Sequence, residues 1–249
     1  MVATPDVIAQ WEAYAAVGDN FEPPEPSAEC LDFLAGLTMG GRALDLGAGT
    51  GRVAVQLARR GVSVTALDIS SKAVEIISQK ADGLPVDAIV GDMSDFALKE
   101  KHGVAYSTYS TLFALLTQKE QAACFRCVSE SLAPEGSFVV DVFSPLNDAG
   151  VRALNHTSVR SIGNGHVDVT YMRHNPVTQR MRFQEVRVTG QGNRLVPVDI
   201  RYAWPSELDL MATLSGLRLS ARYADWGKQP YNATSFRNIS VYTAAAAHQ

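Results

Sequence analysis

The chain has 249 residues, 46% of them hydrophobic, and a formal net charge of −4 at pH 7. This length is short for two complete domains, so we expect a single domain over residues 1–249 with one hydrophobic core. No apolar run approaches the about 18 residues of a membrane-spanning helix, and the first residues lack the basic and apolar regions of a secretion signal. We therefore expect a cytoplasmic protein that binds no membrane.

The charge of the chain is divided unevenly between its two parts. Residues 1–150 contain 10 Lys and Arg against 20 Asp and Glu, whereas residues 151–249 contain 12 against 6. A basic region can bind nucleic acid or anionic ligands. The same arginines can also cover the solvent-exposed face of a sheet, and the charge balance by itself leaves both interpretations open.

Helical segments and then an alternating pattern make up the first part of the chain. Residues 1–40 are expected to form a helical cap, with a proline-containing break at 22–26 and a helix over 27–37. Apolar runs expected to be strands follow at 42–47, 62–70, 86–93, 103–110 and 136–143, with helices between them at 51–60, 71–81 and 118–132. This alternation over 41–150 is typical of a doubly wound parallel sheet, whose ligands bind beyond the carboxyl ends of the strands.

The pattern changes after about residue 150. Three strand-like runs follow one another with only turns between them, at 166–172, 180–188 and 195–204, which predicts an antiparallel insert over about 150–204. A helix over 206–217 with Ser206 as its N-cap, and strands at 217–226 and 239–244, are expected within 205–249. The predicted fold is α/β: a doubly wound, mostly parallel, seven-stranded Rossmann-like sheet with an antiparallel β insert before the last strands.

Three glycines stand within five residues after the first apolar run. Gly47, Gly49 and Gly51 give the order strand, turn, helix, in which backbone N–H groups at a helix N-terminus bind a nucleotide-type ligand. The third position of a dinucleotide fingerprint is a small residue, and here it is Arg52. The turn therefore fits a nucleotide-type ligand other than a dinucleotide.

An acidic residue stands at or near the end of each of the first three predicted strands. Asp45 precedes the first glycine by two residues, Asp68 lies at the end of the second strand and Asp92 at the end of the third. A carboxylate at Asp68 can accept hydrogen bonds from a ribose diol, and Asp92 can accept one from an adenine amino group. Over residues 40–145, this pattern resembles the class I S-adenosylmethionine-dependent methyltransferases.

Further segments resemble the small-molecule branch of that family, which includes natural-product and sugar-amine methyltransferases. Residues 106–116 and 130–143 are similar to its fourth and fifth strand regions, although His102-Gly103 replaces a frequent aromatic and acidic pair. The resemblance implies S-adenosylmethionine as cofactor, S-adenosylhomocysteine as product, no metal, and an aromatic cover from Trp11 or Tyr14. The candidate cofactor-binding residues are Asp45, Gly47, Gly49, Gly51, Asp68, Ile69, Asp92, Met93, Tyr106, Ser107 and Tyr14.

The acceptor is inferred by exclusion. The segment Tyr106–Tyr109 lacks the proline motif of enzymes that methylate base amino groups, and it lacks the acidic residues that a guanidinium or a catalytic metal requires. We therefore expect in-line N- or O-methylation of a small molecule, helped by proximity and orientation. Tyr109 is predicted to line the acceptor site, and His174 is an imidazole available as a general base.

Two other functions remain open at this point. An RNA- or protein-modifying methyltransferase could dock through the basic second half, and a non-catalytic protein could retain the cofactor pocket. Arg180, Arg182 and Arg187 alternate with apolar residues instead of clustering, which favours a small-molecule partner and no nucleic acid. We expect a monomer or a homodimer, and the sequence does not identify the acceptor.

Overall fold

The computed structural model describes residues 4–17, 25–145 and 154–244. The chain begins with α1 (Pro5–Val17) and α2 (Ala28–Leu37), in agreement with the predicted helical region. The Ser27 side chain accepts a hydrogen bond from the backbone N–H of Cys30, which satisfies one of the unpaired donors at the start of α2. Part of the predicted break at 22–26, and the predicted start of the insert, fall outside the described residues.

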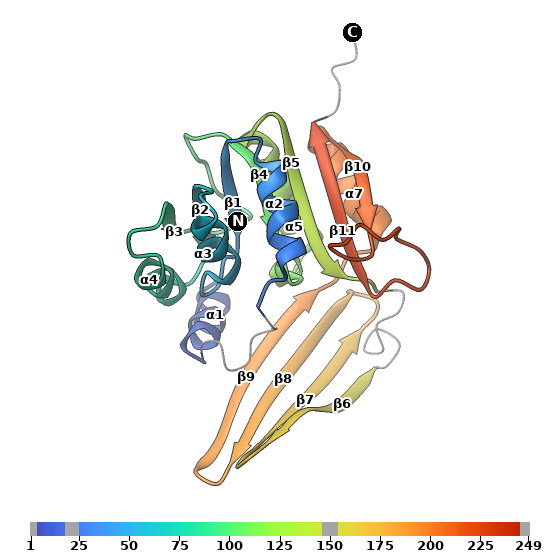
Figure 1. Cartoon of the computed structure of the whole chain (residues 1–249). Helices are drawn as coiled ribbons and strands as arrows, with labels where there is room; N and C mark the ends of the chain where they lie inside the picture. Colours follow the sequence, from blue (N-terminus) through green and yellow to red (C-terminus); the bar gives the residue numbers. More distant parts are fainter. Residues whose placement is uncertain (1–3, 18–24, 146–153, 245–249) are drawn as a thin grey trace.

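Seven strands form the central sheet, in the order β10-β11-β5-β4-β1-β2-β3 (Figure 1). Neighbours from β5 to β3 are parallel, whereas β11 pairs antiparallel with both β5 and β10. The strands are β1 (Arg42–Leu46), β2 (Val64–Asp68), β3 (Val86–Val90), β4 (His102–Ser107), β5 (Leu132–Phe143), β10 (Leu217–Tyr223) and β11 (Arg237–Ala244). The helices that connect them are α3 (Arg52–Arg59), α4 (Ser71–Lys80), the 3-10 helix η2 (Thr111–Ala114), α5 (Gln118–Ser131) and α7 (Pro205–Leu214).

The strand order reverses between β1 and β4, and this reversal positions the site. Both strands are buried almost throughout because helices cover both faces of the sheet, as is usual for parallel strands. Two large core clusters of described residues accordingly pack on the sheet, one on each face. The chain leaves β1 and β4 in opposite directions, so a crevice opens at their carboxyl ends, where ligands bind in sheets of this type.

A second, antiparallel sheet in the order β6-β7-β8-β9 extends from the core (Figure 1). Its strands are β6 (Asn155–Gly163), β7 (His166–Asn175), β8 (Arg180–Thr189) and β9 (Gly192–Arg201). The predicted fold class is confirmed, but the insert has a strand more than the three predicted. The sequence signal missed β6 because this edge strand is exposed along most of its length and has no apolar alternation.

The boundaries of several elements also differ from prediction. Helix α7 begins at Pro205, and Trp204 is its N-cap, so the expected capping role of Ser206 is wrong. Proline suits the first helical position because it has no N–H to leave unpaired and its φ angle is already helical. Strand β5 begins at Leu132, before the expected start at 136, and β10 ends at Tyr223, before the expected end at 226.

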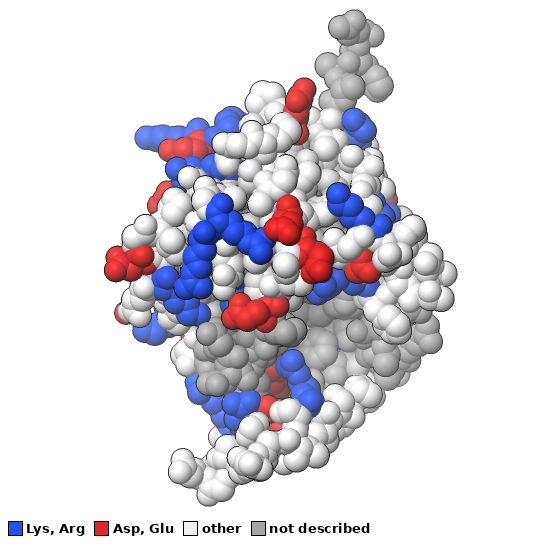
Figure 2. Space-filling model, in the orientation of Figure 1, with Lys and Arg blue, Asp and Glu red and all other residues white. Residues whose placement is uncertain are grey.

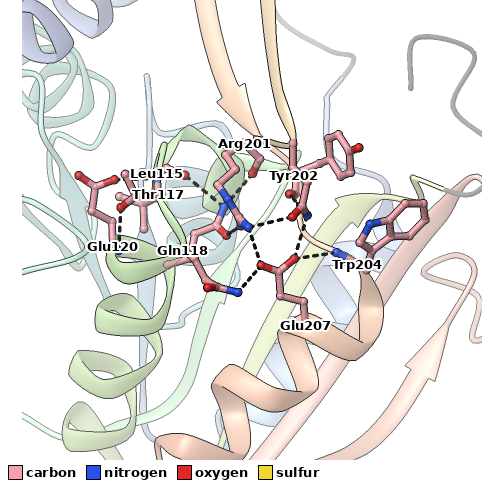
Figure 3. A network of polar contacts seen from close by, with 10 residues as sticks. Leu115, Thr117, Gln118, Glu120, Arg201, Tyr202, Trp204 and Glu207 are labelled. Carbon is pink, nitrogen blue, oxygen red and sulfur yellow. Dashed lines mark hydrogen bonds and ion pairs between the residues drawn. The ribbon is translucent and has the colours of Figure 1, made fainter. Parts of the chain in front are cut away.

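A buried polar network attaches the insert to the core where β9 ends (Figure 3). Arg201 donates hydrogen bonds of 2.6 Å to Glu207 on α7 and to Gln121 on α5. Gln179, in the turn before β8, donates to Glu207 at 2.9 Å. Burial disfavours the ionised form of Glu207, but the hydrogen bonds from Gln179 and Arg201 outweigh it and hold the pKa below its ordinary value. The network therefore fixes how the insert leaves the core.

We expect Arg201→Met to lower the free energy of unfolding by about 3 kcal/mol, because the Glu207 carboxylate would stay buried without its cation. The matched control is Arg182→Met, which removes an ion pair with Asp199 on the same sheet. The Arg182 side chain is 70% exposed, so its loss should cost less than about 1 kcal/mol. Urea unfolding of both variants measures the difference, and equal losses would contradict a structural role for the network.

Candidate active site

The three glycines after β1 differ in what surrounds them. All three have positive φ, at 66° for Gly47, 56° for Gly49 and 83° for Gly51, a region that other residues rarely adopt. A Cβ atom at Gly47 would lie 2.2 Å from the methyl group of Thr111, and one at Gly51 would lie 3.0 Å from Ile77. A Cβ atom at Gly49 would meet no protein atom within 4 Å. Gly49 is therefore the position where the backbone borders open space.

Asp45, Asp68 and Asp92 lie at the carboxyl ends of neighbouring strands, as predicted, and all three line one cavity. The two carboxylate oxygens of Asp68 accept hydrogen bonds from the backbone N–H groups of Gly49, at 2.7 Å, and Ser70, at 2.9 Å. One oxygen of Asp92 accepts from the backbone N–H of Ser94 at 2.8 Å. Asp68 thus ties the glycine loop to the turn after β2.

These acids are held in an environment that opposes their ionisation. Burial raises the pKa of Asp45 to about 7, with the charge of Asp68 adding to the shift. Burial likewise raises the pKa of Asp68 to about 6, against the hydrogen bonds from Ser70 and Gly49. A cationic ligand favours the ionised form of a buried carboxylate, so this end of the cavity suits a ligand that carries positive charge.

The segment after β4 lines the cavity two residues later than predicted. Tyr106 and Ser107 are fully buried in the core and are not among the cavity-lining residues. Thr108, Tyr109, Ser110 and Thr111 take that position. The reason is that β4 continues to Ser107, so the chain turns toward the cavity only after the strand ends.

The turn after β4 is held in an unusual conformation. Tyr109 and Ser110 have positive φ, at 54° and 65°, which is costly for residues other than glycine. The buried Asp141 of β5 accepts the backbone N–H of Tyr109 on its carboxylate at 3.0 Å and that of Ser110 on its carbonyl at 2.9 Å. Arg237 of β11 lies 2.9 Å from the same carboxylate. Strain of this kind persists only where the surroundings enforce it.

Tyr109 lines the cavity, and two cations lie near its ring. The guanidinium carbon of Arg52 lies 4.5 Å from the ring centre, and that of Arg237 lies 6.0 Å away. Arg52 thus has a packing role at the position where it broke the dinucleotide pattern. Burial raises the pKa of the Tyr109 hydroxyl, which is therefore protonated at neutral pH and cannot act there as a base.

His174 lies elsewhere. It is buried at the base of the insert, its Nε2 atom is 3.2 Å from the hydroxyl of Tyr202, and it does not line the cavity. The predicted strand over 166–172 ends before His174, but β7 continues to Asn175 and the imidazole is buried. This position gives no support to the expected role of His174 as a general base.

Helix α1 and the insert close the cavity, which has a volume of about 440 Å³. Trp11 and Tyr14 line it from α1, whereas Phe183, Glu185, Val198 and Ile200 line it from β8 and β9. The Glu12 carboxylate accepts hydrogen bonds from the backbone N–H groups of Ser71, at 2.7 Å, and Lys72, at 3.3 Å, at the start of α4. The N-terminal helix is therefore joined to the core beside the cavity.

The cavity fits the cofactor that the resemblance implies. The backbone of Gly49 borders open space, acids from three strands line the same end, and Ile69 and Met93 lie there as well. Gly51 does not line the cavity and is instead the N-cap residue of α3. Within the described residues, no cluster of His, Cys, Asp and Glu could hold a metal ion. No helix in this part of the chain is long and apolar enough to cross a membrane.

Sequence reasoning missed several residues that shape the site. The sequence gives no signal for Glu12 and Glu185, and it does not indicate that Asp141 holds the turn after β4, because each acts through contacts with segments distant in the chain. Their roles depend on which strands pair and on which face each side chain lies. Only the alternation of residues along β8 could have placed Glu185 on the same face as Phe183.

Comparison with known proteins agrees with this geometry. A family model described as a methyltransferase domain matches residues 43–136. The solved CcbJ methyltransferase of Streptomyces caelestis is 34% identical, with a TM-score of 0.90, over 97% of this chain and 100% of that chain. The cypemycin N-terminal methyltransferase of a Streptomyces species is 24% identical over 81% of this chain and 82% of its own length.

A more distant solved structure shares the fold. It is an amino pentose methyltransferase from Micromonospora echinaspora with S-adenosylmethionine bound, 18% identical, with a TM-score of 0.68 over 94% of this chain and 92% of that chain. The glycine loop, the acids at three strand ends and the 34% identity over nearly the whole chain lead to one conclusion. The chain belongs to the S-adenosylmethionine-dependent methyltransferase family.

Proposed function

We propose that the cavity binds S-adenosylmethionine at the end formed by β1, β2 and β3, and a small natural-product acceptor at the end formed by α1 and the insert. The observation that carries this proposal is the single cavity shared by the acids Asp45, Asp68 and Asp92 and by the insert residues Phe183 and Val198. Among the related proteins whose names state an acceptor are an amino pentose methyltransferase, a cypemycin N-terminal methyltransferase and a magnesium-protoporphyrin O-methyltransferase, which supports a small acceptor over a macromolecule.

The cofactor contacts in this proposal follow from position. Asp68, beside the glycine loop, binds the ribose diol with the lone pairs that its two backbone hydrogen bonds leave available. Asp92 and the backbone of Met93 bind the adenine edge. Asp45 and the turn of residues 108–111 bind the methionine part, and Tyr14 covers it. Gly47 and Gly51 shape the loop, and Tyr106 and Ser107 support it from the core.

The chemistry asks for alignment more than for side-chain reactivity. When bound, the cofactor supplies a methyl group carried on a sulfonium, a form in which a nucleophile can attack the methyl carbon in line and the thioether can leave. The chain must hold the acceptor in that line and exclude water, which contributes roughly 7–11 kcal/mol of barrier reduction. Trp11 and Tyr14 on α1, with Phe183, Val198 and Ile200 on the insert, supply an apolar enclosure for this purpose. Tyr109 lines the wall between the two ends.

Many of the arginines in the basic second half pair with carboxylates of the chain itself. Arginines 160, 182, 187, 201, 222 and 237 each form an ion pair with a carboxylate of the chain itself. Figure 2 shows acidic and basic side chains interspersed over the visible face. An RNA-binding surface needs cations that are available to phosphates, so this pairing favours the small acceptor.

Gly49→Ala is expected to weaken binding of S-adenosylhomocysteine by about tenfold or more, which corresponds to at least about 1.4 kcal/mol. The reason is that the new Cβ atom would occupy the open space at the cavity wall. The matched control is Gly61→Ala, which also has positive φ, at 84°, and open space around its Cβ position, but does not line the cavity.

Both alanine variants should lose about 1–2 kcal/mol of stability, the usual cost of a left-handed backbone for a residue with a Cβ atom. Calorimetric titration and thermal unfolding separate the two effects. Unchanged affinity in Gly49→Ala, or an equal loss in Gly61→Ala, would show that the glycine loop is not the cofactor site.

Cofactor affinity is expected to fall as the pH drops through the range of about 7 to 6. The pKa values of Asp45 and Asp68, about 7 and about 6, lie above the ordinary value, so both acids take up protons in this range. Protonated Asp45 no longer attracts the cationic methionine part of the cofactor, and protonated Asp68 is a weaker acceptor for the ribose hydroxyls. Each proton that must be displaced costs up to about tenfold in affinity per pH unit. Calorimetry near neutral pH should record proton release on binding, and Asp45→Asn should remove the part of the dependence nearest pH 7. Affinity that does not vary with pH would refute these assignments.

A further inference from the structure

The insert presents one face of its sheet to the cavity. Phe183 and Glu185 are two residues apart on β8, and Val198 and Ile200 are two residues apart on β9. Residues at this spacing share a face of the sheet, and all four side chains line the cavity. Three of the four are apolar. Among the described residues of the insert, Glu185 is the carboxylate that lines the cavity.

The carboxylate of Glu185 is only half satisfied. Its Oε1 atom accepts a hydrogen bond from Arg160 of β6 at 2.6 Å. Its Oε2 atom is buried and has no hydrogen-bond partner among the described residues, and the side chain as a whole is 14% exposed. The hydroxyl of Thr170, directly opposite on β7, also lacks a partner within the described chain. Two adjacent polar groups on this face are therefore left without one.

A neighbouring acid on the same sheet provides the contrast. Asp168, opposite Arg187 on the next rung, receives two hydrogen bonds of 2.7 Å from that guanidinium. The hydroxyl of Ser161 donates to it at 2.7 Å as well. Asp168 does not line the cavity. The sheet thus satisfies the acid outside the cavity on both oxygens and leaves an oxygen unused on the acid inside it.

Burial of a carboxylate with an unused oxygen is costly, because that oxygen has given up water without a replacement. Consistent with this, burial raises the pKa of Glu185, and the charge of Arg160 offsets the effect only in part. If the pairing with Arg160 were the whole role of Glu185, a two-pronged geometry like that of Asp168 and Arg187 would be expected. A hydrogen-bond donor on a bound ligand would give Oε2 the partner that it lacks.

We propose that Glu185 binds the amino group of the methyl acceptor through Oε2, so that the acceptor is an amine and the reaction is N-methylation. This inference rests on the proposed function of the cavity. The apolar body of the amine would lie against Phe183, Val198 and Ile200. A carboxylate suits this task because it pairs with an ammonium group and accepts its N–H hydrogen bonds.

The step balances with Glu185 as the proton acceptor. An amine that enters as the ammonium cation passes one proton to Oε2, and the freed lone pair on nitrogen forms the N–C bond. The C–S bond breaks as the N–C bond forms, and its electron pair stays on sulfur, which becomes a neutral thioether. The product nitrogen carries the positive charge, and the proton on Glu185 leaves to water.

The test uses the full chain saturated with S-adenosylhomocysteine and three ring probes, cyclohexylamine, piperidine and the neutral cyclohexanol. Calorimetry is expected to detect binding of both amines and at least about tenfold weaker binding of cyclohexanol. Glu185→Gln keeps the shape of the side chain and should weaken amine binding by about 10- to 100-fold, the usual loss for a charged hydrogen bond. Methyl transfer to the amines from radiolabelled S-adenosylmethionine should fall in parallel.

The control variant is Asp199→Asn, which removes a carboxylate of the same sheet that does not line the cavity, and it should bind the amines as the wild type does. Cofactor affinity should be unchanged in both variants. Unaltered amine binding in Glu185→Gln, equal binding of cyclohexanol and cyclohexylamine, or no binding of either amine would overturn the role of Glu185. Failure of the wild-type chain to bind S-adenosylhomocysteine would instead overturn the proposed function.

Discussion

The rest of the site depends on the carboxylate of Asp68, because it links the glycine loop to the start of α4 and, through α4, to the helix α1 that borders the cavity. One oxygen fixes the backbone N–H of Gly49 and the other fixes that of Ser70. The Ser70 side chain in turn caps α4, accepting the backbone N–H of Ala73 at 3.0 Å. The exposed first turn of α4 then receives the carboxylate of Glu12 from α1. A continuous run of hydrogen bonds therefore connects the cofactor loop to the helix that covers the cavity.

The same run reaches the insert. Tyr14 of α1 packs with Val196 and Val198 of β9, and Arg194 of β9 donates to the carbonyl of Ala16 at 3.3 Å. The other end of β9 is fixed by Arg201 through its network with Glu207 and α5. The insert is thus attached at both ends of β9, at one end to the core and at the other end to α1. A cavity bounded in this way can limit the access of water to the reacting atoms, while α1 and the insert together shape its acceptor end.

A site residue could be predicted from the sequence where its role depends on residues close to it in the chain. The acids at the strand ends and the glycines of the loop could be predicted, since the carboxyl ends of parallel strands meet at the same edge of a sheet. The exact end of β4 could not be predicted from the sequence. The predicted contacts Tyr106 and Ser107 therefore fall within the strand, and the cavity is lined from Thr108 onward. Roles set by packing between distant segments, such as the burial of His174 against Tyr202, have no local signal.

His102 and Gly103, where the sequence departs from the family, also have roles that depend on packing between distant segments. A Cβ atom at Gly103 would lie 2.2 Å from the carbonyl oxygen of Thr38, so the close approach of α2 to β4 requires glycine there. His102 is buried, with its ring nitrogens 3.1 Å from the hydroxyl of Thr65 and 3.3 Å from the carbonyl of Ser131. Burial lowers the pKa of this histidine, which is neutral in that setting. The departure is therefore a packing solution at the end of β4 away from the cavity.

Charge placement along the cavity follows the course of methyl transfer. Positive charge begins on the sulfur of the cofactor and ends on the acceptor, and a site that stabilised only the first position would oppose the reaction. All three acids line the cavity, and in the proposed arrangement Asp45 and Asp68 lie at the cofactor end and Glu185 at the acceptor end. Arg52 lines the cavity but packs on the ring of Tyr109, and Arg237, which also contacts that ring, is paired with Asp141. The acids at the cofactor end can attract the charge on sulfur before transfer, and Glu185, once it has released its proton to water, can attract the charge left on the product nitrogen.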